Sequence, residues 1–90
     1  MIDDIDYIDD DLITFVSTGV NLNIESIKYC LENGIECNID ALGKSFNGYI
    51  QVLTNEHVQV RQQLTGNRFM NAVISLHDID FISYVTELKV

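Results

Sequence analysis

The chain has 90 residues, and this length excludes a multidomain protein because domains usually run to about 100–150 residues. Its composition, 47% apolar and 21% charged, excludes a disordered tail and is typical of a soluble globular protein. The sequence therefore predicts a single domain, 1–90, made of an acidic N-terminal segment (1–11), a helical part (12–47) and a mainly β part (48–90).

Fourteen acidic and five basic residues give a formal net charge of −9, and the excess is concentrated at one end of the chain. The first 40 residues hold ten of the acids and a single base, Lys28. Because phosphate groups are bound by clustered Lys and Arg, direct binding to DNA, RNA or an anionic membrane is not expected. The complementary partner is a basic protein surface, towards which the charge would steer the encounter.

The sequence carries no targeting signal and only two cysteines. Its start lacks the basic segment and the apolar stretch of about 7–15 residues that a secretory signal needs, and no apolar run approaches the roughly 20 residues of a membrane span. We therefore expect a cytoplasmic protein, in the host cytoplasm if it is viral. Cys30 and Cys37 fit neither a zinc ribbon nor a CxxC pair, so two reduced thiols are expected, with a single bridge as the less favoured alternative.

The acidic segment 1–11 repeats an isoleucine at every third position, at Ile2, Ile5 and Ile8. Burying each of them would contribute about 1.5–3 kcal/mol, which offsets part of the repulsion among the aspartates. We therefore expect at least part of the segment to dock on the folded body, with its aspartates projecting outward as a fixed negative ridge. A first helix is expected to follow, from Asp9 to a stop at Thr18.

Two more helices are expected before residue 48. Asn23 is a good N-cap, apolar residues recur after it at helical spacing, and Gly34 supplies a stop, so 23–33 is the clearest helix. A shorter helix is expected over 38–46, closing at Gly48.

After Gly48 the apolar residues alternate with a period of two. Residues 49–54 and 57–62 are expected to form a β-hairpin. Residues 68–76 and 81–90 fit either a strand or a helix, and β-branched and aromatic content favours a strand for 81–90. The predicted fold class is α+β, with two or three N-terminal helices packed on a C-terminal antiparallel sheet of three or four strands.

No motif predicts catalysis, a cofactor or a metal site. If Asp4 opens an EF-hand loop, Ile8 and Phe15 fall where the loop needs ligands. His57 and His77 have no nucleophile or second acid placed beside them by any signature. We expect no enzyme, although a deep pocket that held either histidine with a carboxylate would indicate one.

The leading hypothesis is a small acidic binding or inhibitor protein that occupies a basic surface of a nucleic-acid-handling protein or toxin. Its carboxylates would stand in for phosphates, as in a nucleic-acid mimic. In size and charge asymmetry the chain resembles, as a class, phage-encoded inhibitors of host or defence proteins and bacteriocin immunity proteins. The predicted partner-binding residues are Asp3, Asp4, Asp6, Asp9, Asp10, Asp11, Glu25 and Glu32.

The alternative is a structural or assembly protein that homo-oligomerises through its C-terminal sheet. The terminal strand 81–90 would then present an open edge to a second subunit, and the net charge would serve only solubility. Light scattering at micromolar concentration separates the two hypotheses.

Overall fold

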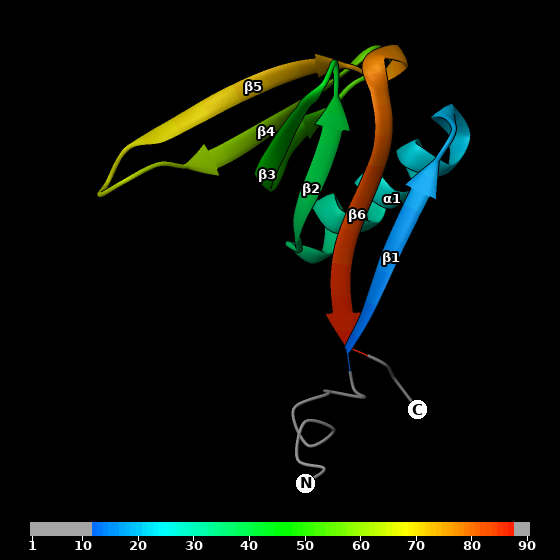
Figure 1. The fold of residues 1–90 in the computed structure, drawn as a ribbon, viewed down its shortest axis with the longest axis horizontal. Coiled ribbons are helices and arrows are strands. Elements are labelled where there is room, and N and C mark those ends of the chain that lie inside the picture. The colour runs from blue at the N-terminus through cyan, green and yellow to red at the C-terminus, as the bar shows by residue number, and fades with distance from the viewer. Residues whose placement is uncertain (1–11, 88–90) are drawn as a thin grey trace, which may run out of the picture.

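The computed structural model describes residues 12–87, which form one six-stranded antiparallel sheet with a single α-helix packed on it (Figure 1). In chain order the elements are β1 (Leu12–Thr18), α1 (Val20–Asn33), β2 (Glu36–Ala41), β3 (Lys44–Leu53), β4 (His57–Gln63), β5 (Phe69–Ser75), the short 3-10 helix η2 (Leu76–Asp78) and β6 (Ile79–Glu87). The strand order across the sheet is β1-β6-β2-β3-β4-β5, and every neighbouring pair is antiparallel.

The fold class predicted from the sequence is wrong, because two of the predicted helices are strands. Residues 12–18 form β1, which pairs with β6 along all its seven residues, from Leu12 opposite Glu87 to Thr18 opposite Phe81. Residues 38–46 lie in the β2–β3 hairpin. The described part of the chain is therefore mostly β.

A two-residue turn explains why the predicted helix 38–46 does not form. Leu42 and Gly43 connect β2 to β3, and both have positive φ, 55° and 74°. Positive φ at both central residues is the geometry of the type I′ turn, whose twist matches that of a two-strand hairpin. The chain reverses there instead of continuing as a helix.

The predictions for 23–33 and for the hairpin after Gly48 are confirmed. The helix α1 begins earlier than predicted, at Val20, so that Asn23 lies inside it and donates its backbone N–H to the Gly19 carbonyl at 2.9 Å. It ends as predicted at Gly34, which is left-handed with φ 63°. Residues 69–75 and 79–87 are both strands.

The terminal strand is not an edge of the sheet, which corrects the prediction for 81–90. Within the described residues, β6 lies between β1 and β2 and pairs with both. The edges of the sheet are β1 and β5.

The core lies between α1 and one face of the sheet. Ile27 of the helix packs with Ile39 on β2 and Ile82 on β6, and all three are fully buried. The remaining buried apolar side chains come from every strand except β1: Cys37, Ala41, Ile50, Val58, Val60, Ile74 and Ile79, with Cys30 from α1 and Leu76 from η2. The helix covers this face, where it lies chiefly against β1, β3 and β6 and also packs on Ile39 of β2. The opposite face, called the open face below, has no helix from the described residues over it (Figure 1).

Polar contacts hold the edge strand β1 to the helix. The Ser17 hydroxyl donates to Oδ1 of buried Asn23 at 3.1 Å and lies 2.9 Å from the Ser26 hydroxyl. On the same side Phe15 stacks on Tyr84 with a centroid separation of 5.3 Å. These contacts fix which side of β1 faces the core, and therefore which side chains it presents on the open face.

Candidate interaction surface

The structure separates the predicted partner-binding residues. Asp3, Asp4, Asp6, Asp9, Asp10 and Asp11 lie outside the described residues, as does the predicted docking of segment 1–11. Glu25 and Glu32 are both exposed on α1, with Lys28 between them in the helix. They are therefore on the helix side of the molecule and not on the open face.

Strand alternation defines which side chains form the open face. On β2 the buried residues Cys37, Ile39 and Ala41 face the helix, so Glu36, Asn38 and Asp40 point the other way. The cross-strand register extends this assignment to the neighbouring strands, because residues directly opposite one another lie on the same face.

Four apolar side chains gather on the open face at the β1 end of the sheet. Leu12 and Val16 come from β1, where they are 48% and 60% exposed. Phe81 and Val85 come from β6, opposite Thr18 and Thr14 of β1. We call these four residues the β1–β6 patch. Exposed apolar side chains that adjoin one another are a recurring mark of a protein contact surface.

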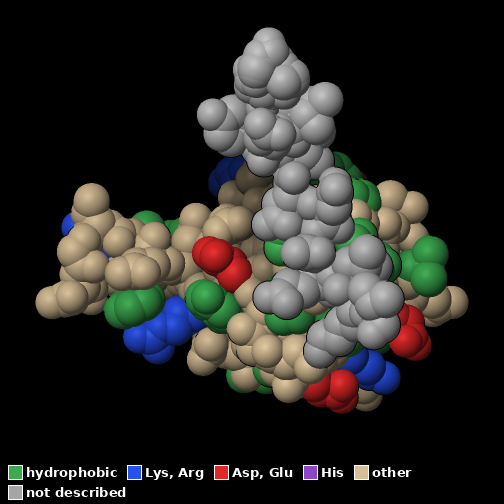
Figure 2. Space-filling view, turned by 90° about the horizontal axis from the view of Figure 1, so that it is seen from below, with side chains coloured by type: hydrophobic (Ala, Val, Ile, Leu, Met, Phe, Trp, Pro, Cys, Tyr) green, Lys and Arg blue, Asp and Glu red, His purple; other side chains and the backbone are tan. Residues whose placement is uncertain are grey.

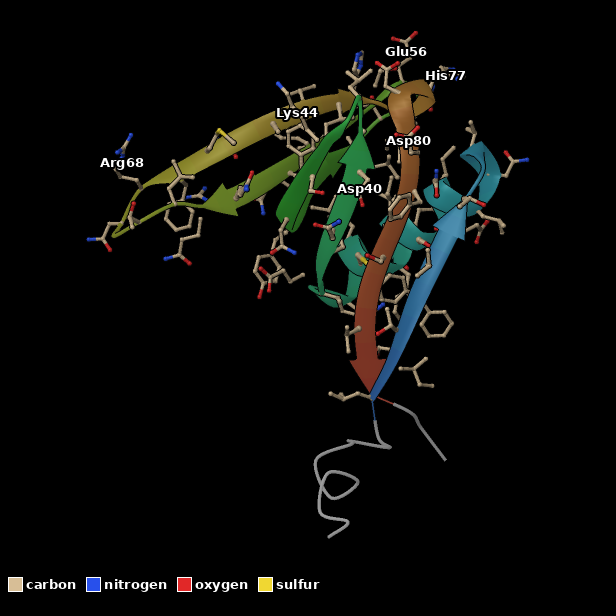
Figure 3. The ribbon with its side chains drawn as sticks, viewed as in Figure 1. Asp40, Lys44, Glu56, Arg68, His77 and Asp80 are labelled. Carbon is tan, nitrogen blue, oxygen red and sulfur yellow. The ribbon has the colours of Figure 1, made fainter. Side chains whose placement is uncertain are left out.

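A groove of about 320 Å³ adjoins the patch and runs across the middle of the sheet. Its lining includes six residues of the open face, namely Thr14, Glu36, Asn38, Asn47, Ser83 and Val85, together with Ile35, Cys37 and Tyr84. Asp40, labelled on β2 in Figure 3, accepts hydrogen bonds from the Asn38 amide at 2.9 Å and from the Ser45 hydroxyl. The groove thus offers hydroxyl and amide groups beside an apolar patch, and the Asn38 amide among them is held by Asp40.

The other end of the open face carries positive charge. Arg61 of β4 holds its guanidinium 4.1 Å from the centre of the Phe69 ring on β5, a cation–π contact, and lies opposite Tyr49 of β3. Arg68 lies at the tip of the β4–β5 hairpin (Figure 3). Residues 57–77 contain these two arginines and no acid.

Carboxylates do not form a ridge on the described body. Residues 12–87 contain eight acidic and four basic residues, a much smaller excess than in the whole chain. In Figure 2 the Asp and Glu side chains appear as separate small patches, and hydrophobic side chains are exposed between them. The mimicry hypothesis therefore depends chiefly on the six aspartates of 1–11.

Neither histidine lines the groove or the second hollow of the described residues. His57 begins β4 and His77 lies in η2, and both are exposed. The groove has no histidine in its lining, and a second hollow, about 280 Å³, is lined by α1, the β3–β4 turn and Leu76. Within 12–87 there is no group of three His, Cys, Asp or Glu residues that could hold a metal ion.

The two cysteines are free and buried side by side between α1 and β2. A hydrogen bond between their thiols lowers the pKa of Cys30, against the effect of burial, and the same bond together with burial raises the pKa of Cys37. Of the pair, Cys30 therefore loses the first proton while Cys37 keeps its own. The thiols pack as small apolar groups of the core.

Comparisons of the chain with protein families, with curated proteins and with solved structures gave no significant match. Within residues 12–87, the helices lack the length and apolar content needed to cross a bilayer.

The β1–β6 patch was not predicted from the sequence, because residues 12–18 were expected to form a helix. The signal was the alternation of Leu12, Thr14 and Val16, which places them on one side of a strand. The prediction of a strand for 81–90 was correct for the two patch residues on β6. Nothing in the local sequence, however, shows that this strand pairs with β1.

Proposed function

We propose that this protein is a small acidic binding protein that occupies a basic surface of a protein partner, such as a nuclease, a polymerase, a defence complex or a toxin. The contact would combine the β1–β6 patch with the acidic run that precedes it. The observation that carries the proposal is this adjacency. Leu12, the first residue of the patch, follows Asp11 directly in the chain, so the acidic run is joined covalently to the apolar patch.

The two parts of the surface supply different contributions. Aspartates attract a basic partner and speed its approach, an effect that salt weakens within a Debye length of about 8 Å at physiological ionic strength. The four apolar side chains lose water on contact and set how long the complex lasts. The hydroxyl and amide groups of the neighbouring groove can meet polar groups of the partner, as the rim of an interface does.

The test uses the full chain as bait in a lysate of its native host, with the captured proteins identified by mass spectrometry and their affinities then measured with purified components. Wild-type protein is compared with three variants. One replaces the six aspartates of 1–11 by asparagine, one combines Val16→Ser with Phe81→Ser, and a control carries Leu22→Ser. Leu22 is exposed to the same extent as Val16 but lies on α1.

We expect a basic protein to be captured, with affinity that falls steeply with salt. The asparagine variant should lose most of the salt dependence, the patch variant should dissociate faster at any salt concentration, and the Leu22→Ser control should bind like wild type. Binding that is insensitive both to salt and to removal of the six aspartates would overturn the proposal.

A further inference from the structure

Within residues 12–87, the edge strand β5 is a sheet edge that no other segment covers. Its seven residues, Phe69–Ser75, include no charged residue and no proline, and its pairing with β4 runs without a bulge. Val73 is 65% exposed on the open face, and Phe69 and Met70 are also exposed. Monomeric sheet proteins usually guard such an edge with lysine, proline, a bulge or a covering segment, because free backbone groups invite another strand.

The hydrogen bonds at the two ends of the hairpin show which backbone groups of β5 are free. The Leu64 N–H donates to the Arg68 carbonyl at 2.8 Å, and the Leu76 N–H donates to the Glu56 carbonyl at 2.9 Å. Both pairs continue the β4–β5 register, in which hydrogen-bonded and non-bonded pairs alternate. Even-numbered residues therefore bond to β4, and the residues whose N–H and C=O groups point to the outer edge are Phe69, Asn71, Val73 and Ser75.

The two ends of this edge carry opposite charge. Arg68 immediately precedes β5 at the hairpin tip, whereas Asp78 follows it in η2 and Glu56 lies at the same end (Figure 3). In an antiparallel pair of two β5 strands, the tip of each copy lies beside the acidic end of the other. In such a pair, Arg68 of each copy therefore lies near the acidic end of the other copy's β5 strand.

We propose that β5 pairs antiparallel with β5 of a second copy about a twofold axis at Ala72, which joins the two sheets into one of twelve strands. In this register all four outward-facing residues form hydrogen-bonded pairs, with Phe69 opposite Ser75 and Asn71 opposite Val73 of the second copy. The helices of both copies lie on the same face of the joined sheet. This surface is distinct from the β1–β6 patch, so the inference does not rest on the proposed function.

The register gives a direct test by cross-linking. Ala72 would face Ala72 of the second copy in a non-hydrogen-bonded pair, where Cα atoms lie about 4.5 Å apart, within the range that a disulfide spans. Under mild oxidation, Ala72→Cys should form a covalent dimer at least about tenfold faster than a Val16→Cys control, which places the thiol on the other edge strand. The native cysteines are buried and common to both variants.

Sedimentation and light scattering supply the second test, from about 5 to about 500 µM, the range in which a micromolar Kd is measured. Wild type should shift from monomer to dimer, Val73→Lys should weaken the dimer by at least about tenfold because each copy then carries a lysine on its edge, and Val16→Lys should not change it. Circular dichroism verifies that each variant is folded.

A wild-type chain that stays monomeric over this range, together with Ala72→Cys cross-linking no faster than the control, would overturn the proposal. A dimer that Val16→Lys disrupts and Val73→Lys does not would place the contact at β1 and overturn it equally. Neither outcome bears on the binding of a basic partner. The two proposals can therefore be refuted independently of each other.

Discussion

Replacing Gly48 by alanine should destabilise the protein strongly, because β3 and β4 approach each other too closely there for a side chain. Gly48 is buried in β3 opposite Cys37 of β2. An added Cβ would overlap the Arg61 carbonyl oxygen of β4 and lie 3.1 Å from Cα of Gln62. These obstacles are backbone atoms, so no side chain can turn away to make room.

The loss of stability can be estimated from the backbone shift that β4 would need in order to make room for the new Cβ. Overpacking in a core costs about 1–3 kcal/mol, and a backbone obstacle belongs at the upper end, whereas alanine returns about 0.5–1 kcal/mol through the unfolded chain. The free energy of unfolding should therefore fall by about 2–2.5 kcal/mol. For a chain of this size that lowers Tm by roughly 10–20 °C.

Urea unfolding followed by circular dichroism measures the effect, with Gly43→Ala as the matched control. Gly43 has open space around it but a φ of 74°, so its replacement should cost about 1 kcal/mol from backbone strain alone. A Gly48→Ala variant as stable as the Gly43→Ala variant would refute the close-approach argument.

Three further outcomes are expected. Ile39→Ala, at a fully buried position, should lower the free energy of unfolding by about 2–5 kcal/mol in the same urea assay. Cys30 and Cys37 should react with a thiol reagent at neutral pH no faster than the protein unfolds, and equal native and denatured rates would contradict their burial. The raised pKa values of Cys37 and Tyr84 should make the free energy of unfolding fall as pH rises past about 9, since the unfolded chain then releases protons that the folded state keeps. The lowered pKa of Cys30 acts in the opposite direction only below that pH, so urea titrations at about pH 9.5 and about pH 10.5 measure the fall, and a rise would contradict the sign.

The local sequence was enough to predict the helix α1 and the β3–β4 hairpin, because their apolar residues fit only one kind of secondary structure. The helix α1 has apolar residues at helical spacing and a glycine stop, and Gly34 adopts the left-handed conformation that the stop requires. The hairpin of β3 and β4 alternates strictly over its length apart from one bulge near Val52. The helix was predicted because its apolar residues recur at helical spacing over several turns. The hairpin was predicted because its apolar residues alternate with a period of two over both strands.

The elements that were mispredicted depend on partners distant in sequence. Seven residues, Leu12–Thr18, are too few to distinguish a helical stripe from alternation, and it is pairing with β6, some seventy residues later, that makes them a strand. The β2–β3 turn uses Leu42 at a positive φ of 55°, a conformation that asparagine or glycine would have signalled and leucine does not. The prediction of a helix over 38–46 was therefore wrong because the turn at Leu42 and Gly43 was not recognised in the sequence.

The candidate surfaces were less predictable than the fold because they are properties of strand order. The sequence shows that Val16, Phe81 and Val73 are apolar, but only the order β1-β6-β2-β3-β4-β5 places the first two side by side and the third on an edge. Charge, by contrast, was visible at once, and it remains the basis for expecting a basic partner. Residues 12–87 carry less than half of that net charge, −4 of −9.

The sheet order also determines how the two surfaces can operate together. The β1–β6 patch and the β5 edge lie at opposite ends of one sheet, so pairing through β5 leaves both β1 ends outermost and free. A paired molecule would then present two copies of the β1–β6 patch, each preceded in the chain by an acidic run. A partner with two basic sites, or a partner that is itself a dimer, would bind it with avidity far above the affinity for one copy. A single-site partner would gain nothing from the pairing. The variants that separate the two surfaces therefore also report on valency: Val73→Lys should weaken binding to a two-site partner and leave the affinity for a single site unchanged.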